Sequence, residues 1–148
     1  MRGLIQRVSC AHVSVEQKTV GAIDTGIVLL LGVQQDDTRQ QADKLLHKVM
    51  NYRIFNDAEN KMNLSLQQTG GGLLIISQFT LAAETQKGLR PGFSTAAAPD
   101  DARILYDYFV AQAHLSTGVD HTIATGIFAA DMQVSLVNDG PVTFLLEA

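Results

Sequence analysis

The chain has 148 residues, of which 46% are hydrophobic and 18% charged, and its formal net charge is −4. This length predicts one domain, 1–148, because two halves would each be too small for a good core. The high apolar content excludes a disordered chain, and the acidic balance argues against a general duplex-DNA binder. The single cysteine, Cys10, cannot form an intrachain disulfide, and no apolar run reaches the ~20 residues of a membrane helix. We therefore expect a cytoplasmic protein without a membrane segment.

The first third of the chain has the patterns of strands. Apolar residues at Leu4 and Val8, followed by alternation over 12–16, predict a strand, a turn and a second strand. Another short strand is predicted over 20–23. The run 27–33 is apolar on both faces, which is typical of a strand buried on both sides.

A helix is predicted over 38–51. Thr38 and Gln41 have the spacing of a capping box, in which the hydroxyl caps the first amides and the glutamine reaches back. The apolar stripe of this helix consists of Ala42, Leu45, Leu46, Val49 and Met50. The later elements are a strand over 52–55, a turn over 56–60, a strand over 73–77 continuing to 81, a polar loop over 84–94, a helix from Pro99 to about His114, strand character from 123, a strand over 132–137, a turn over 138–141 and a closing strand over 142–146. Together they predict a mixed α/β fold with two helices and one sheet-based core.

The familiar metal and phosphate motifs are missing from the sequence. The four histidines lack metal-ligand spacing and there is no Cys-x-x-Cys, so we expect no metal site and no cofactor. The glycines at 70–72 fit neither a Walker loop nor a dinucleotide fingerprint, and no Gly-x-Ser-x-Gly elbow occurs.

Two polar segments stand where core strands are expected to end. The first, 77–81, either makes ordinary hydrogen bonds at the sheet margin or faces a ligand. The second, 138–143, is rich in turn-forming residues. It is either a plain hairpin turn or a rigid Gly-Pro unit that presents its backbone carbonyls to a ligand.

These segments, SQFTL at 77–81 and NDGPVT at 138–143, resemble the two signature motifs of the D-aminoacyl-tRNA deacylases (D-Tyr-tRNA(Tyr) deacylases). The resemblance extends over the whole chain, including LIQRV at 4–8, LLLGV at 29–33 and LYDYF at 105–109. It implies hydrolysis of the ester that joins a D-amino acid, or mischarged glycine, to the terminal adenosine of tRNA. It also implies a compact, barrel-like curved sheet with two packed helices that works as a homodimer.

The resemblance assigns Gly140-Pro141, with a cis peptide bond, as the chirality filter. Its backbone carbonyls would crowd the side chain of an L-amino acid and hold the α-amino group, so that specificity arises from a clash. The motif of one subunit would enter the site of the other, and Arg7 would brace it by hydrogen bonding. The remaining substrate-binding residues that we expect are Asn138, Val142, Thr143, Met132 and Phe128.

The opposite wall of the expected site is catalytic and consists of Ser77, Gln78, Phe79 and Thr80. Backbone amides near Phe79 and Thr80 would form an oxyanion hole. No motif places a base beside the Thr80 hydroxyl, and an unactivated hydroxyl is a poor nucleophile. We therefore favour hydrolysis assisted by the 2′-OH of the terminal ribose.

The partner implied by the resemblance is the aminoacylated end of tRNA, with no DNA partner. Phosphate contacts are expected from Arg2, Lys87 and Arg90. The sequence departs from common family residues outside the motifs, at Cys10, Gly92, Thr95 and Ile127. Two other functions stay open on the same scaffold: a small-molecule ester hydrolase, and a non-catalytic RNA-binding module. The first lacks a triad or metal, and the second lacks a basic stripe with stacking aromatics.

Overall fold

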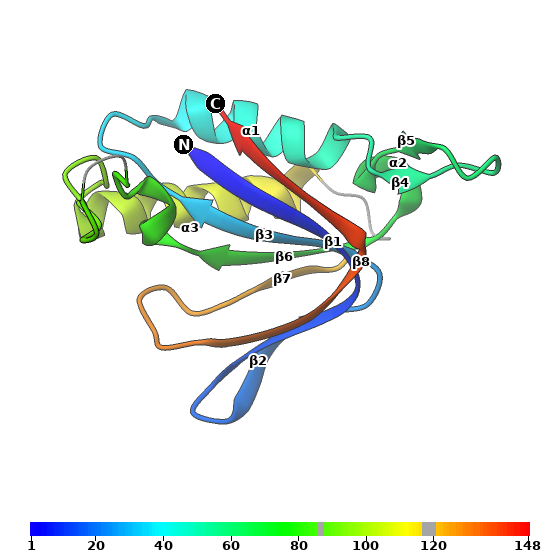
Figure 1. The fold of residues 1–148 in the computed structure, drawn as a ribbon, viewed down its shortest axis with the longest axis horizontal. Coiled ribbons are helices and arrows are strands. Elements are labelled where there is room, and N and C mark those ends of the chain that lie inside the picture. The colour runs from blue at the N-terminus through cyan, green and yellow to red at the C-terminus, as the bar shows by residue number, and fades with distance from the viewer. Residues whose placement is uncertain (86–87, 117–120) are drawn as a thin grey trace.

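The computed structural model describes residues 1–85, 88–116 and 121–148 (Figure 1). In chain order the elements are β1 (Arg2–Val15), β2 (Lys18–Ile23), β3 (Gly26–Gly32), α1 (Arg39–Asn51), β4 (Phe55–Asn56), β5 (Met62–Leu64), α2 (Leu66–Thr69), β6 (Gly72–Ser77), the 3-10 helix η1 (Phe79–Ala82), α3 (Pro99–Ser116), β7 (Ile123–Thr125) and β8 (Gln133–Glu147). None of the helices in these ranges is long and apolar enough to cross a membrane.

Strand β1 organises the main sheet, because it pairs with three other strands. One of its edges runs antiparallel to β8. Along its other edge, β1 pairs with β3 over residues 2–8 and with β2 over residues 11–15. Strands β3, β6 and β7 continue the sheet in parallel, so the order is β2-β1-β3-β6-β7 with β8 on β1.

The sheet curls until β2 approaches β7. Gly21 allows this approach, since a Cβ there would lie 2.4 Å from the carbonyl oxygen of Thr125. The curl encloses a small core of Val8, Ala11, Val13, Ile23, Val28, Leu74 and Ile76. The prediction of a barrel-like curved sheet in a mixed α/β fold is confirmed.

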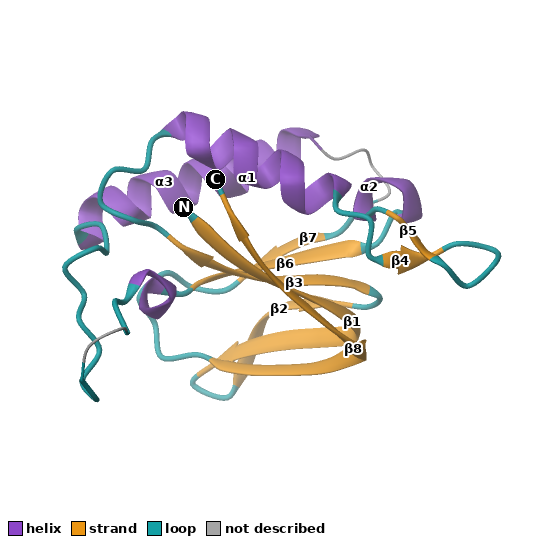
Figure 2. Cartoon of the chain, turned by 45° about the horizontal axis from the view of Figure 1, so that its top comes forward, coloured by secondary structure: helices purple, strands orange, loops and turns teal. Residues whose placement is uncertain are grey.

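Helices α1 and α3 cover the other face of the sheet and bury the larger core (Figure 2). The capping box of Thr38 and Gln41 is present, and the five residues of the predicted apolar stripe of α1 are buried. Helix α3 begins at Pro99 as predicted and runs to Ser116. The prediction of two helices was incomplete, because the short α2 and η1 also form. Both are single turns without the periodicity that marks a longer helix.

Several predicted element boundaries were wrong. The two strands predicted within residues 4–16 are one strand, β1, and the predicted strand–turn–strand over 132–146 is one strand, β8. Register shifts opposite each other in these strands absorb the extra residues as bulges, so neither strand ends. The strand predicted over 52–55 is reduced to β4, which pairs with β5 in a separate two-stranded sheet. The predicted continuation of β6 to residue 81 is instead η1.

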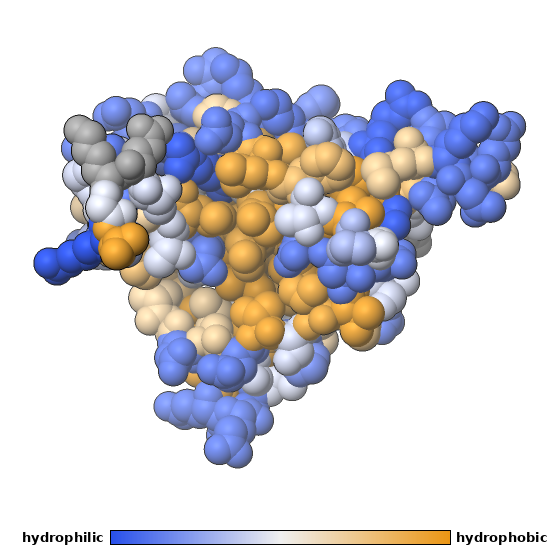
Figure 3. Space-filling model, viewed as in Figure 1, coloured by the Kyte–Doolittle hydropathy of each residue, from blue (hydrophilic) through white to orange (hydrophobic). Residues whose placement is uncertain are grey.

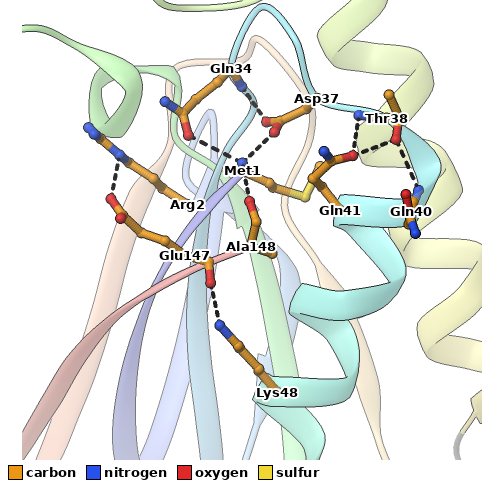
Figure 4. A network of polar contacts seen from close by, with 10 residues as sticks. All are labelled: Met1, Arg2, Gln34, Asp37, Thr38, Gln40, Gln41, Lys48, Glu147 and Ala148. Carbon is orange, nitrogen blue, oxygen red and sulfur yellow. Dashed lines mark hydrogen bonds and ion pairs between the residues drawn. The ribbon is translucent and has the colours of Figure 1, made fainter.

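A network of polar contacts ties the two chain ends to α1 and to the loop that precedes it (Figure 4). The ammonium of Met1 donates to the side chains of Gln34 and Asp37 and to the carbonyl oxygen of Ala148. The Lys48 ammonium donates to the carbonyl oxygen of Glu147 at 2.5 Å. These contacts fix the outer ends of β1 and β8 against the helix that covers them.

Candidate active site

A pocket of about 490 Å³ opens where β3 and β6 end. Its walls come from the segment after β6, the start of α3, and the turn that precedes β8. The lining residues are Leu31, Val33, Ile76, Ser77, Gln78, Phe79, Ala96, Ala97, Pro99, Ala102, Tyr106, Phe128, Ala129, Ala130, Met132 and Val134.

The chemistry of this pocket is apolar and neutral. Its described lining residues include no acid, base or histidine, and hydroxyl and amide groups stand only at its edge and floor. At the floor, the Tyr106 hydroxyl donates to the carbonyl oxygen of Ile75 at 3.0 Å. Burial raises the pKa of Tyr106 to about 12, with a smaller contribution from Asp107, so the phenol stays protonated in ordinary buffers. Such a pocket suits an uncharged ring or nucleoside better than an isolated ion.

Replacing Tyr106 with phenylalanine is expected to lower the free energy of unfolding by about 1 kcal/mol near pH 7. The loss stays small because the amide of Gly126 also donates to the Ile75 carbonyl. Since the pKa of Tyr106 is raised on folding, its contribution is complete below pH 10 and is lost as the pH rises towards 12. Urea unfolding of both proteins from pH 7 to 11.5 measures this. An advantage of the wild-type protein that grows above pH 10 would contradict it.

The segment 77–80 leaves the sheet and turns. Ser77 is the last residue of β6, and the side chain of Phe79 is 61% exposed and packs against Phe93 with ring centroids 5.1 Å apart. The Gln78 amide donates to the Thr80 hydroxyl at 2.5 Å. An amide cannot remove a proton from that hydroxyl, and Thr80 itself is exposed at the side of the pocket rather than lining it.

The segment 138–143 bulges from the sheet. Gln6 pairs with Thr143 and Val8 with Asn138, so residues 139–142 stand opposite Arg7 alone. The buried Arg7 guanidinium donates to the carbonyl oxygens of Asp139 (2.9 Å) and Ile54 (2.6 Å) and lies 3.5 Å from the Asp139 carboxylate. Arg7 therefore holds this bulge to the loop before β4.

Inside the bulge, Asn138 closes the turn. Its side-chain oxygen Oδ1 accepts from the main-chain amide of Val142 at 2.7 Å, and its side-chain nitrogen Nδ2 donates to the Thr143 hydroxyl at 2.9 Å. The side chain of Val142 is buried in the core, whereas Gly140 and Pro141 are exposed and joined by a cis peptide bond. Asn138, Val142 and Thr143 thus have contacts that shape the bulge, and Gly140-Pro141 is the part that projects.

The two segments do not meet within one chain. Ser77 lies opposite Leu31, whereas Arg7 lies opposite Ile27, four residues away along β3 or roughly 13 Å. The pocket brings together five of the predicted site residues, namely Ser77, Gln78, Phe79, Phe128 and Met132. Gly140 and Pro141 are not among its lining residues.

Comparison with known proteins identifies the family. The family model described as D-Tyr-tRNA(Tyr) deacylase matches residues 4–147, which include both polar segments and the pocket. The chain belongs to the D-Tyr-tRNA(Tyr) deacylase family. Similar curated proteins named D-aminoacyl-tRNA deacylase come from Cellvibrio japonicus, at 62% identity, and Haemophilus ducreyi, at 64% identity. In both cases 99% of each chain is covered over 147 residues.

Two solved structures also match this member of the deacylase family. One, named c-Myc DNA Unwinding Element Binding Protein, is 36% identical with a TM-score of 0.95, covering 100% of this chain and 99% of that one. Another, described as a probable eukaryotic D-amino acid tRNA deacylase, has 18% identity and a TM-score of 0.84, covering 99% of this chain and 98% of that one. The second shows a shared fold.

Sequence reasoning missed part of the pocket of this deacylase-family chain. Pro99, Ala102 and Tyr106 line it from one face of α3, at a helical spacing that the sequence displays but that a buried stripe explains equally well. Ala96 and Ala97, from the Ala-rich patch at 95–98, line the pocket with small side chains. Of the expected phosphate contacts, Arg2 donates to the carbonyl oxygen of Leu81 and pairs with Glu147, Arg90 is exposed, and Lys87 lies outside the described residues. In the described parts of the chain, no group of three or more His, Cys, Asp or Glu side chains is placed to hold a metal ion.

Proposed function

We propose that this protein hydrolyses the ester between a D-amino acid, or mischarged glycine, and the terminal adenosine of tRNA. The observation that carries the proposal is the family match over 4–147, which includes the pocket and both polar segments. The neutral, apolar pocket offers a surface for the adenosine and the amino-acid side chain. The proposed enzyme acts in the cytoplasm, uses neither metal nor cofactor, and does not bind DNA as a partner.

The proposed chemistry relies on backbone and substrate groups. The amides of Phe79 and Thr80 are the first of η1, where a helix leaves N–H groups without acceptors of its own. Such donors beside the pocket would stabilise the oxyanion that forms when the ester carbonyl is attacked. The 2′-OH of the terminal ribose stands next to the ester and would assist the attacking water.

The proposed chirality filter is the exposed Gly140-Pro141 unit. Its backbone is held from behind by Arg7, through the Asp139 carbonyl, and from the side by Asn138. A rigid pair of carbonyl oxygens would clash with the side chain of an L-amino acid, while a D-amino acid or glycine would fit. Because this unit lies outside the pocket of its own chain, the proposal requires a second copy.

A homodimer is supported by an exposed apolar surface on β8. Leu145 of β8 is 56% exposed. It lies opposite Leu4 of β1, which in turn lies opposite Leu30 of β3, so the three side chains share one face of the sheet. In Figure 3 apolar side chains gather over the face that β1 and β8 present. An exposed apolar area that is continuous with a projecting motif is typical of an interaction surface. Leu145→Glu is expected to shift the protein from dimer to monomer in analytical ultracentrifugation and to lower activity in parallel.

Exchange of the motif between subunits has its own test. Gln78→Ala and Pro141→Ala chains are each expected to be poorly active, and mixing them is expected to restore about a quarter of the wild-type activity. Random exchange of subunits makes half of the dimers mixed. If the motif acts on the partner, one of the two sites in each mixed dimer combines an intact Gln78 with an intact Pro141. Mixtures that stay as inactive as their components would place the motif in its own chain's site.

The activity is tested with D-Tyr-tRNA, L-Tyr-tRNA and a D-Tyr ester that lacks the ribose. Selective release from D-Tyr-tRNA supports the proposal. Equal release from the L-form contradicts the filter, and equal release from the simple ester favours a small-molecule ester hydrolase. Binding of tRNA with no release would favour the RNA-binding module.

Thr80→Ala is expected to retain substantial activity, because none of the described residues places a base on the hydroxyl and the ester would be activated by backbone amides that alanine keeps. Single-turnover deacylation of D-Tyr-tRNA measures this. Thr80→Pro provides a contrasting variant, since it removes the amide itself. A loss of more than about a thousandfold in Thr80→Ala would identify Thr80 as a covalent nucleophile.

A further inference from the structure

The rim of the neutral pocket carries an arginine that the proposed chemistry does not use. Pro99 and Tyr106 line the pocket from α3, and Arg103 lies between them on the same helical face, at i+4 from Pro99. Its guanidinium lies over the ring of Phe128, 5.6 Å from the centroid, and Phe128 lines the pocket. Helical position and ring contact independently place this cation at the pocket edge.

The charge of Arg103 is available to a ligand. The side chain is 61% exposed, and its ion pair with Asp107 is long, at 3.8 Å, with Asp107 62% exposed. Exposed i,i+4 pairs contribute only about 0.3–0.5 kcal/mol. Asp100, three residues earlier on the helix, is also exposed. A phosphate that accepts two parallel hydrogen bonds from a guanidinium competes well with such neighbours.

We propose that Arg103 binds the 5′-phosphate of the terminal adenosine of the substrate and thereby positions the ester in the pocket. This inference rests on the proposed function and names the part of the tRNA that the rim recognises. When the terminal adenosine of a tRNA enters the pocket, it brings its 5′-phosphate with it, and the described lining residues offer that phosphate no cation. Arg103, whose guanidinium lies over the ring of Phe128, supplies the charge at the edge. It acts on affinity and placement and takes no part in bond cleavage.

The test uses two stable analogues, 3′-deoxy-3′-(D-tyrosylamino)adenosine with and without a 5′-monophosphate, titrated by calorimetry. The wild-type protein is expected to bind the phosphorylated analogue about tenfold more tightly, and Arg103→Gln to lose this preference while binding the unphosphorylated analogue as before. Asp107→Asn, which frees the guanidinium, is expected to increase the preference. Arg39→Gln is the matched control, because Arg39 also lies over an aromatic ring, Tyr108, but that ring is not part of the pocket.

The outcomes separate this proposal from the activity itself. Two results would overturn the role of Arg103 even if D-Tyr-tRNA is deacylated. The first is a wild-type protein that binds both analogues equally well. The second is an Arg103→Gln protein that loses affinity for both analogues to the same extent. A preference that depends on Arg103 in a protein without deacylase activity would overturn the proposed function and keep the phosphate site. With active protein, Arg103→Gln is expected to raise KM for D-Tyr-tRNA five- to tenfold with little change in kcat.

Discussion

Replacing Gly140 with alanine is expected to abolish deacylation and to lower the free energy of unfolding by roughly 3 kcal/mol. The backbone of Gly140 has φ = +144°, which L side chains rarely adopt. A Cβ there would lie 2.6 Å from Cγ2 of the buried Val142 and 2.9 Å from its amide nitrogen. The bulge must therefore move, and the proposed filter moves with it.

Gly70→Ala is the matched control for this change. Gly70 also has positive φ, +70°, but a Cβ there would have no atom within 4 Å. Gly70→Ala is expected to lower the free energy of unfolding by only about 1 kcal/mol and to leave the deacylation rate unchanged. Urea unfolding and initial rates on D-Tyr-tRNA compare the two variants. Equal stability of the two, with activity in both, would show that the bulge tolerates a side chain.

Replacing Arg7 with alanine is the second change expected to have a large effect. The guanidinium is buried, and its loss would leave the carbonyl oxygens of Ile54 and Asp139 without these donors. We expect a loss of about 2–4 kcal/mol in the free energy of unfolding. We also expect at least a hundredfold loss in kcat/KM, because a displacement of about 1 Å at a site can cost that much.

Asp139→Asn separates the two contacts between Arg7 and the bulge. It removes the carboxylate, which is 60% exposed, and keeps the main-chain carbonyl that accepts from Arg7. We expect less than about 1 kcal/mol of destabilisation and near-normal activity. If Asp139→Asn were as damaging as Arg7→Ala, the ion pair would hold the bulge instead of the hydrogen bond.

Local patterns predicted the elements whose signals are local. The capping box at Thr38, the apolar stripe of α1, the first position of α3 at Pro99 and the doubly buried β3 are all present in the structure. The predictions failed where the extent of a strand depends on pairing with a strand that is distant in sequence. Turn residues at 138–141 predict the end of a strand, but pairing with β1 continues on both sides of them.

The site was predictable in parts. One pocket is lined by the segment 77–79, Phe128 and Met132, as expected from the sequence. The sequence did not predict that Ala102 and Tyr106 line the pocket. On a helix, residues that face a pocket and residues that face the core recur with the same period. The contact of Arg7 with Ile54 joins residues far apart in sequence, and no spacing rule connects them.

The pairing of β1 with β8 also sets the order in which the molecule can be completed. It joins the earliest strand of the chain to the last one, so it has the largest sequence separation of any pairing in the sheet. During synthesis, β1, β3 and β6 can associate under α1 before β8 has left the ribosome. The segment that carries Gly140-Pro141 would then be added to an existing sheet. Discrimination between mirror-image substrates would be the last property that the chain acquires.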